Sequence, residues 1–109
     1  MTGKQYQNLA MRTAPDVSND DRVKHALHGM VGEVGEVHSL YQKVYQGHTI
    51  DKEHVKKEIG DLLWFVAEYV DANGWTLDEI MQKNIDKLKA RYPEGFDSDK
   101  SLNRVEGDI

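Results

Sequence analysis

Helical periodicity is the feature that most limits what this chain can fold into. Four helix-breaking residues divide the chain: Pro15, Gly47, Gly74 and Pro93. Between them, apolar residues recur at steps of three and four, which is the spacing of one helix face. No segment alternates apolar and polar residues as a half-buried strand does. The sequence therefore predicts an all-α fold, a helical bundle of about four helices that forms a single domain over residues 1–109.

Local residue chemistry sets the expected ends of the first two helices. The first is expected over residues 4–13, and Pro15 stops it because proline disfavours helix in the preceding residue and has no N–H. The second is expected to start near Asp20, with Ser18 or Asn19 as its N-cap. Its long apolar stripe makes it, together with the third helix, one of two central helices.

The remaining boundaries follow from glycine and from capping residues. Gly47 is expected to end the second helix, because glycine adopts the left-handed conformation of a C-terminal cap without a steric penalty. Asp51 is expected to cap the third helix, which ends at Gly74. The segment that begins at Thr76 has the spacing of a capping box for the fourth helix. Residues 93–109 are expected to form an irregular C-terminal tail.

Bulk composition excludes several classes of function. The formal net charge of −5 gives no overall attraction to a phosphate backbone, so a nucleic-acid scaffold is not expected. The chain has no cysteine, which excludes disulfides and thiolate zinc sites. No apolar run approaches the roughly 20 residues that cross a bilayer, and the N-terminus lacks the apolar stretch of a signal peptide. We therefore expect a soluble, cytoplasmic protein without a membrane or nucleic-acid polymer as partner.

Four glycines stand inside the two central helices. Gly29, Gly32 and Gly35 lie three apart in the second helix, and Gly60 lies in the third. Each costs about 1 kcal/mol relative to alanine in a helix interior. Glycines at this spacing bare a narrow strip of backbone, where a ligand or another helix can approach closely. Tight helix packing without any ligand is the alternative.

Two acidic pairs occur at the same spacing in the two central helices. They are Glu33 with Glu36, and Glu58 with Asp61. Residues three apart project from the same side of a helix, so the two pairs can face each other in an antiparallel hairpin. Four neighbouring carboxylates raise one another's pKa values, and a divalent cation removes that conflict. We therefore expect one divalent-metal site suited to phosphate chemistry; ordinary solvated acids on a helix surface are the alternative.

The types of ligand narrow the choice of metal. Hard oxygen ligands without histidine or cysteine favour Mg²⁺, Mn²⁺ or Ca²⁺ over zinc. A di-iron site in a helical bundle usually carries Glu-x-x-His pairs, but Glu36 and Asp61 stand where the histidines would be. Iron–oxygen chemistry is therefore not expected.

Polar residues line one side of the fourth helix. Lys87 and Arg91 follow Asn84 at three and seven residues. Cations beside an acidic metal site suggest a phosphate chain that spans both, and arginine can hold phosphate oxygens in bidentate fashion. As an alternative, the positive charges of Lys87 and Arg91 only stabilise the C-terminal end of their helix by interacting with its dipole. Asn84 lies on an apolar face, where a buried amide needs hydrogen-bond partners.

Five segments together carry a resemblance to a known family. They are residues 10–13, 32–36, 58–64, 83–88 and 91–96. In this combination they resemble the MazG-like all-α nucleoside triphosphate pyrophosphohydrolases, whose signature is E-x-x-E followed, after a variable stretch, by E-x-x-D. The resemblance extends over nearly the whole chain and shows no departure at the four acidic positions.

The resemblance implies an activity and a role for each candidate residue. Such enzymes hydrolyse an NTP or dNTP between the α and β phosphates, giving the monophosphate and pyrophosphate, with Mg²⁺ (Mn²⁺ often substitutes), and they assemble as homodimers or homotetramers. The acidic residues would be the metal ligands and the catalytic residues: Glu33, Glu36, Glu58 and Asp61. One glutamate, which the sequence does not single out, would orient or deprotonate the attacking water. Lys87 and Arg91 would grip phosphates, and Asn84 would contact the substrate.

Other interpretations remain open at this point. Phosphoribosyl-ATP pyrophosphohydrolases share the logic of the acidic pairs, so the substrate could be another nucleotide. A non-catalytic helical interaction domain could keep a residual metal site, and a structural Ca²⁺ or Mg²⁺ protein would bind metal without turnover. Trp64 could stack on a nucleobase, or it could belong to the core or to a subunit interface. The biological role would be control of nucleotide pools or housecleaning.

Overall fold

The helical spacing of the apolar residues is realised as helices along most of the chain. A computed structural model describes residues 1–104. The elements follow in the order α1 (Gly3–Met11), α2 (Asn19–Gln42), the 3₁₀ helix η1 (Lys43–Gln46), α3 (Lys52–Ala72), α4 (Leu77–Arg91) and α5 (Ser98–Leu102). No strand occurs in this part of the chain. The predicted all-α class is therefore confirmed.

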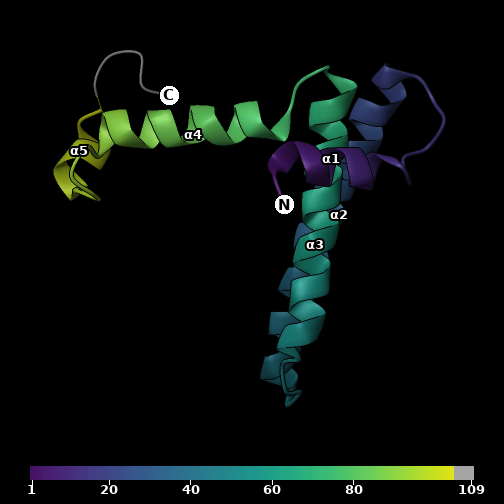
Figure 1. Cartoon of the computed structure of the whole chain (residues 1–109). Helices are drawn as coiled ribbons and strands as arrows, with labels where there is room; N and C mark the ends of the chain where they lie inside the picture. Colours follow the sequence, from purple (N-terminus) through teal and green to yellow (C-terminus); the bar gives the residue numbers. More distant parts are fainter. Residues whose placement is uncertain (105–109) are drawn as a thin grey trace.

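The helices form two unequal arms (Figure 1). Helices α2 and α3 run antiparallel as a hairpin, because the short connection at its tip reverses the chain. Helix α1 lies across one end of this hairpin, and α4 leaves that same end and projects away from it. The Cα radius of gyration is 17.2 Å, whereas a compact domain of this length would have roughly 13 Å. The isolated chain is therefore extended.

Side-chain caps fix the starts of α1 and α2. Thr2 and Gln5 form a capping box at the start of α1, which ends at Met11, two residues before the predicted end. The Ser18 hydroxyl accepts the N–H of Asp21 at 3.2 Å, so Ser18 is the N-cap of α2. Of the two predicted caps, Ser18 is confirmed and Asn19 is the first helical residue.

The later boundaries are close to the predicted ones. Helix α2 ends before η1, and Gly47 then takes the left-handed conformation with φ +91°. Asp51 caps α3 by accepting the N–H groups of the next turn. Gly74 has φ +75°, and the Thr76 hydroxyl accepts the N–H of Glu79 at 3.2 Å, which is one half of the predicted capping box. These turns therefore form where local chemistry places them.

The C-terminal segment departs from its prediction. Residues 93–109 were expected to be irregular, but Ser98–Leu102 form the short helix α5. The cause is local, because the Asp97 carboxylate accepts the N–H of Asp99 at 2.8 Å and so caps a turn of helix. Residues 105–109 of the expected tail lie outside the described residues.

The hydrophobic core is small and lies where α1 crosses the hairpin. Its buried members are Ala10, Ala67, Val70 and Leu77. Trp64 packs against this cluster, and its indole N–H donates to the carbonyl of Ala10 at 3.0 Å. None of the described helices is both long enough and apolar enough to cross a membrane.

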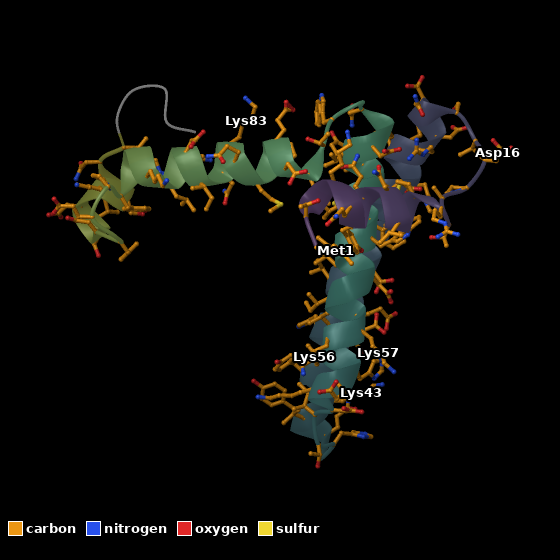
Figure 2. All side chains as sticks on the ribbon, in the orientation of Figure 1. Met1, Asp16, Lys43, Lys56, Lys57 and Lys83 are labelled. Carbon is orange, nitrogen blue, oxygen red and sulfur yellow. The ribbon has the colours of Figure 1, made fainter. Side chains whose placement is uncertain are left out.

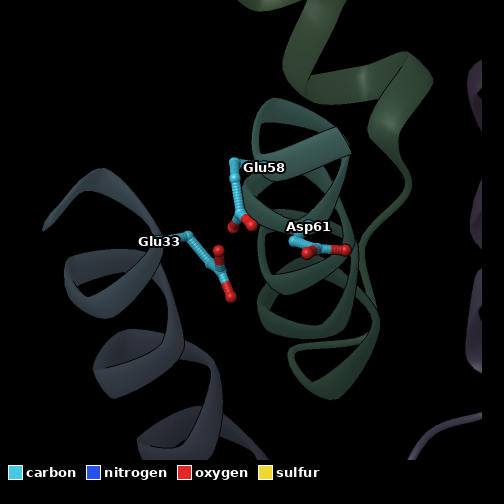
Figure 3. A group of neighbouring side chains, drawn as sticks. All are labelled: Glu33, Glu58 and Asp61. Carbon is cyan, nitrogen blue, oxygen red and sulfur yellow. The ribbon is translucent and has the colours of Figure 1, made fainter. Parts of the chain in front are cut away.

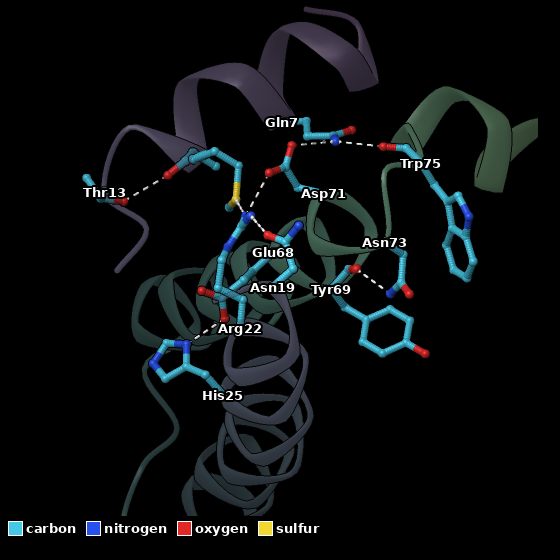
Figure 4. Close-up of polar contacts among 12 residues, drawn as sticks. Gln7, Thr13, Asn19, Arg22, His25, Glu68, Tyr69, Asp71, Asn73 and Trp75 are labelled. Carbon is cyan, nitrogen blue, oxygen red and sulfur yellow. Dashed lines mark hydrogen bonds and ion pairs between the residues drawn. The ribbon is translucent and has the colours of Figure 1, made fainter. Parts of the chain in front are cut away.

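A polar network closes the same end of the hairpin (Figure 4). Gln7 of α1 donates to Asp71 at 3.1 Å and accepts the N–H of Leu77 at 2.9 Å. Arg22 of α2 pairs with Asp71 at 2.7 Å. Because these bonds join α1 and α2 to α3 and to the start of α4, they fix the end of the hairpin from which α4 departs.

Many large apolar side chains remain exposed outside this core. On the hairpin they include Leu27, Val31, Val34, Ile59 and Leu63, with Val31 75% exposed. On α4 they include Met81, Ile85 and Leu88. The covered end of the hairpin and the exposed surfaces are thus clearly separated in this chain.

Candidate metal centre

Three of the four predicted metal ligands come together in the middle of the hairpin (Figure 3). Glu33 projects from α2 toward Glu58 and Asp61, which project from α3. One carboxylate oxygen from each residue lies within 4.8 Å of the other two. The antiparallel hairpin and the three-residue spacing bring them together, as predicted from the sequence.

The fourth predicted ligand lies apart from this group. Glu36 is exposed and is not among the three carboxylates that gather within 4.8 Å. It is one helical turn from Glu33, and its charge still contributes to raising the pKa of that residue. The structure therefore places Glu36 at the edge of the acidic group.

Glu33 is the most perturbed member of the group. A hydrogen bond with Glu58, burial and the charges of Glu58, Asp61 and Glu36 raise the pKa of Glu33 to about 7. Its Oε2 atom is buried without a hydrogen-bond partner among the described residues. A buried oxygen without a partner, beside two further carboxylates, is a site that a hard divalent cation would satisfy. The donor set thus fits a hard divalent cation.

Two cavities adjoin the acidic group. The smaller one, about 290 Å³, is lined by Glu33, Asp61, Trp64 and Phe65. The larger one, about 630 Å³, lies along the first half of α3 and includes Glu58 and Asp61 in its wall. We call the second one the α3 cavity. Because Asp61 lines both, a ligand at the carboxylates can extend into either space.

Trp64 belongs to both the core and the smaller cavity. Its indole N–H donates to Ala10 and to the Thr13 hydroxyl, each at 3.0 Å, which holds the ring against α1. The ring also meets Phe65 edge to face, with centroids 5.1 Å apart. The core interpretation is therefore confirmed, while stacking on a nucleobase stays a prediction.

The helical glycines separate into two kinds. A Cβ atom on Gly29 would lie 2.2 Å from the Phe65 ring, so this glycine is required by tight helix packing. A Cβ on Gly32, Gly35 or Gly60 would have no described atom within 4 Å. Packing within the chain thus explains Gly29, and the other three leave bare backbone that a ligand or a second chain can reach.

The predicted phosphate-binding residues lie away from the acidic group in one chain. Asn84 and Lys87 are exposed on α4, and the Arg91 guanidinium lies 5.8 Å from the centre of the Tyr92 ring. Helix α4 projects away from the hairpin that carries the carboxylates (Figure 1). Asn84 is therefore not on a buried face of the isolated chain, and its role stays a prediction.

Sequence reasoning missed several polar residues near the site. Glu68, fully buried, is hydrogen-bonded to His25, and it lies seven residues after Asp61 on the inner side of α3. Burial and the charge of Asp61 raise the pKa of Tyr6. A glutamate inside an apolar stripe was a signal for Glu68, whereas the position of Tyr6 depends on how α1 crosses the hairpin.

Fold and site together define a class of helical proteins in which carboxylates from facing helices form a candidate metal centre. Within it, the model of the MazG nucleotide pyrophosphohydrolase domain matches residues 22–96, and the chain belongs to this family. The Gene 37 protein of Mycobacterium phage L5 is 27% identical to this chain in an alignment that covers 91% of this chain and 96% of that protein. No solved structure matches. Family membership indicates nucleotide pyrophosphohydrolase activity, and the matched region contains the whole acidic group.

Proposed function

We propose that this protein hydrolyses a nucleoside triphosphate, NTP or dNTP, at the α–β bond to the monophosphate and pyrophosphate. The observation that carries the proposal is the group of Glu33, Glu58 and Asp61, whose oxygens lie within 4.8 Å inside the region that matches the MazG domain. Its role would be pool control or housecleaning, in the cytoplasm.

The proposed mechanism assigns the metal to the hairpin. Glu33, Glu58 and Asp61 would hold Mg²⁺, with Mn²⁺ as a substitute, and Glu36 would adjust the charge at the edge of the site. When bound, such an ion neutralises charge on phosphate oxygens and lowers the pKa of water. Among the residues of the chain, a carboxylate of the acidic group would accept the proton of the attacking water.

The protein is proposed to act as a homo-oligomer, a dimer or a tetramer. Monomeric proteins rarely leave large apolar patches exposed, yet Val31 on the hairpin is 75% exposed and Met81 on α4 is 53% exposed. The extended shape of the chain supports the same proposal. In the oligomer, α4 of a second copy would carry Asn84, Lys87 and Arg91 to the acidic group. The positive charge of Lys87 and Arg91 would complement the carboxylates and bind phosphates, and the Asn84 amide would contact the substrate.

A pyrophosphate-release assay tests the reaction directly. The purified protein is given each canonical NTP and dNTP, dUTP and several damaged nucleotides, with Mg²⁺ and then with EDTA. The expected result is metal-dependent release of pyrophosphate together with the monophosphate. Absence of turnover on every one, with Mg²⁺ still bound, would overturn the proposal in favour of another substrate such as phosphoribosyl-ATP or of a non-catalytic domain.

A further inference from the structure

The α3 cavity is a second approach to the metal centre from within the same chain. It has a volume of about 630 Å³ and is lined by Asp51, Glu53, His54, Lys57, Glu58, Gly60 and Asp61. Two of the three clustered carboxylates belong to this wall. A substrate bound at the carboxylates can therefore extend along α3 without leaving the protein surface.

Most of the acidic side chains in the wall of the α3 cavity already have partners within the chain. Asp51 is occupied as the cap of α3, because its carboxylate accepts the N–H of Glu53 at 3.0 Å. Glu53 in turn forms an ion pair with Lys56 at 2.8 Å. Glu58 accepts a bond from His54, with 3.2 Å between Nε2 and Oε1. The acids nearest the tip of the hairpin are thus already paired or bonded within the chain.

Lys57 differs from its neighbour Lys56 in its ion pairing and in its position relative to the α3 cavity. The two side chains leave α3 in different directions near the tip of the hairpin (Figure 2). Lys56 is paired with Glu53 and does not line the α3 cavity, whereas Lys57 lines it and forms no ion pair among the described residues. Lys57 also lies one helical turn from Asp61, so its ammonium group and that carboxylate share one face of α3.

Gly60 leaves the helix backbone bare on the face of α3 that carries Lys57 and Asp61. Gly60 lies in the cavity wall beside Asp61, and a Cβ there would meet no described atom within 4 Å. Glycine costs about 1 kcal/mol in a helix interior, and packing within this chain does not require it. A bulky anion can therefore lie against the helix between the carboxylates and the ammonium group.

We propose that Lys57 binds the terminal phosphates of the nucleotide from the same chain that supplies the acidic group. The proposal rests on the function proposed above and adds a substrate-binding residue to it. A lysine acts as a mobile point charge, which suits the pyrophosphate portion that the reaction releases. The proposed α4 cations would come from a second copy, so the phosphates would be held from two chains.

The test compares Lys57→Ala with the matched control Lys56→Ala in the full-length protein. Both are exposed helical positions where alanine is a good helix former, so both variants should keep the fold, as thermal unfolding can verify. We expect K57A to raise KM by about tenfold, the size of one lost charge-assisted contact, and to weaken competitive inhibition by inorganic tripolyphosphate similarly. K56A should leave both values unchanged, and K57R should recover part of the loss.

Separate outcomes distinguish this inference from the proposed reaction. If the wild-type protein turns over a nucleotide but K57A and K56A have the same KM and the same tripolyphosphate inhibition, the Lys57 assignment is wrong and the reaction stands. If the wild-type protein neither turns over any nucleotide nor binds tripolyphosphate with Mg²⁺ in calorimetry, both fail. Binding without turnover, weakened in K57A and not in K56A, would support the site while contradicting the reaction.

Discussion

The two arms of this molecule differ in how far their apolar side chains are buried. Where α1 crosses the hairpin, Ala67 and Val70 are buried, and the Gln7 side chain hydrogen-bonds to Asp71 of α3 and to the N–H of Leu77 in α4. Along α4, by contrast, Leu77 is buried at the first turn, while Met81, Ile85 and Leu88 are exposed. One end of the hairpin is therefore covered by elements of the same chain, whereas most of the apolar face of α4 stays uncovered, which is where the proposed homo-oligomer would bury it.

The largest effect is expected at the hairpin. Glu58→Gln removes one ligand charge without removing core volume, so turnover should fall by at least about a thousandfold while the fold remains. The metal-free variant should be as stable as the wild type or more stable, because one repulsive charge is gone. Pyrophosphate release and thermal unfolding in EDTA measure the two effects. A large loss of stability would show that Glu58 is structural and would contradict the repulsion argument.

The next effect sharpens the contrast between the arms. Lys87→Ala combined with Arg91→Ala should lower kcat/KM by about a hundredfold, because two phosphate contacts are lost. If α4 acts on the site of another chain, this double variant and E58Q should complement each other after subunit exchange. Roughly a quarter of the wild-type activity should return, since half of the dimers are mixed and each mixed dimer holds one complete site.

The same mixing experiment has an internal control. Lys57 and Glu58 are supplied by the same chain in the proposed site. A mixed dimer of K57A and E58Q therefore has one site that lacks Lys57 and one site that lacks Glu58, and neither is complete. Mixing these two variants should not raise the activity above that of K57A. No gain of activity when the double α4 variant is mixed with E58Q would show that α4 does not complete a neighbouring site.

A smaller effect is expected when a tightly packed glycine and an unpacked glycine of α2 are each replaced by alanine. Gly29→Ala places a methyl group against the Phe65 ring, and we expect a loss of about 1–3 kcal/mol in the free energy of unfolding. Gly32→Ala meets no described atom, and the better helix former should add about 1 kcal/mol. Chemical denaturation of both variants measures the difference. Equal destabilisation would mean that Gly32 is packed in the assembled protein.

The pH response tests the acidic group in another way. The pKa of Glu33 is raised from 4.5 to about 7, so between these values the folded state keeps a proton that the unfolded state has released. The stability of the metal-free protein should therefore fall as pH rises from about 4.5 to about 7. Glu33→Gln should flatten this part of the curve, measured as the free energy of unfolding in EDTA. An unchanged curve in the variant would contradict the assignment.

At the end of the hairpin that α1 crosses, the contribution of Asp71 to stability should depend on pH in the opposite direction. Burial alone would raise the pKa of Asp71, but hydrogen bonds from Arg22 and Gln7 outweigh it and lower the pKa below 3.8. This residue therefore contributes stability that is present above about pH 3.8 and is lost as pH falls through its lowered value. The two windows do not overlap, so E33Q should leave the acid limb of the curve unchanged.

The parts of the fold that were predictable depend on neighbours in the sequence. Ser18, Asp51 and Thr76 cap helices because a side-chain oxygen reaches an N–H two or three residues away. Glu58 and Asp61 share a helix face for the same local reason. Glu33 could be matched to them because a short connection forces the two long helices to run antiparallel.

The parts that were not predictable depend on directions in space. Helix α4 was correctly expected after Gly74, but the angle at which it leaves the hairpin follows from bonds that Gln7 makes to Trp75 and Leu77, far away in sequence. Helix α5 escaped prediction because its five residues are too few to show periodicity. The position of Glu36 outside the group of three carboxylates likewise depends on how α2 packs against α3, which the spacing of residues in the sequence does not specify.

The positions of the two tryptophans have an optical consequence. Trp64 lines the smaller cavity beside Glu33 and Asp61, while Trp75 stands at the start of the α4 arm, with its ring 6.2 Å from that of Tyr69. Each arm of the molecule therefore carries its own intrinsic fluorophore. Replacing either tryptophan by phenylalanine would leave a protein whose tryptophan emission comes from one position alone, so ligand entry and movement of α4 can be followed separately without any added dye.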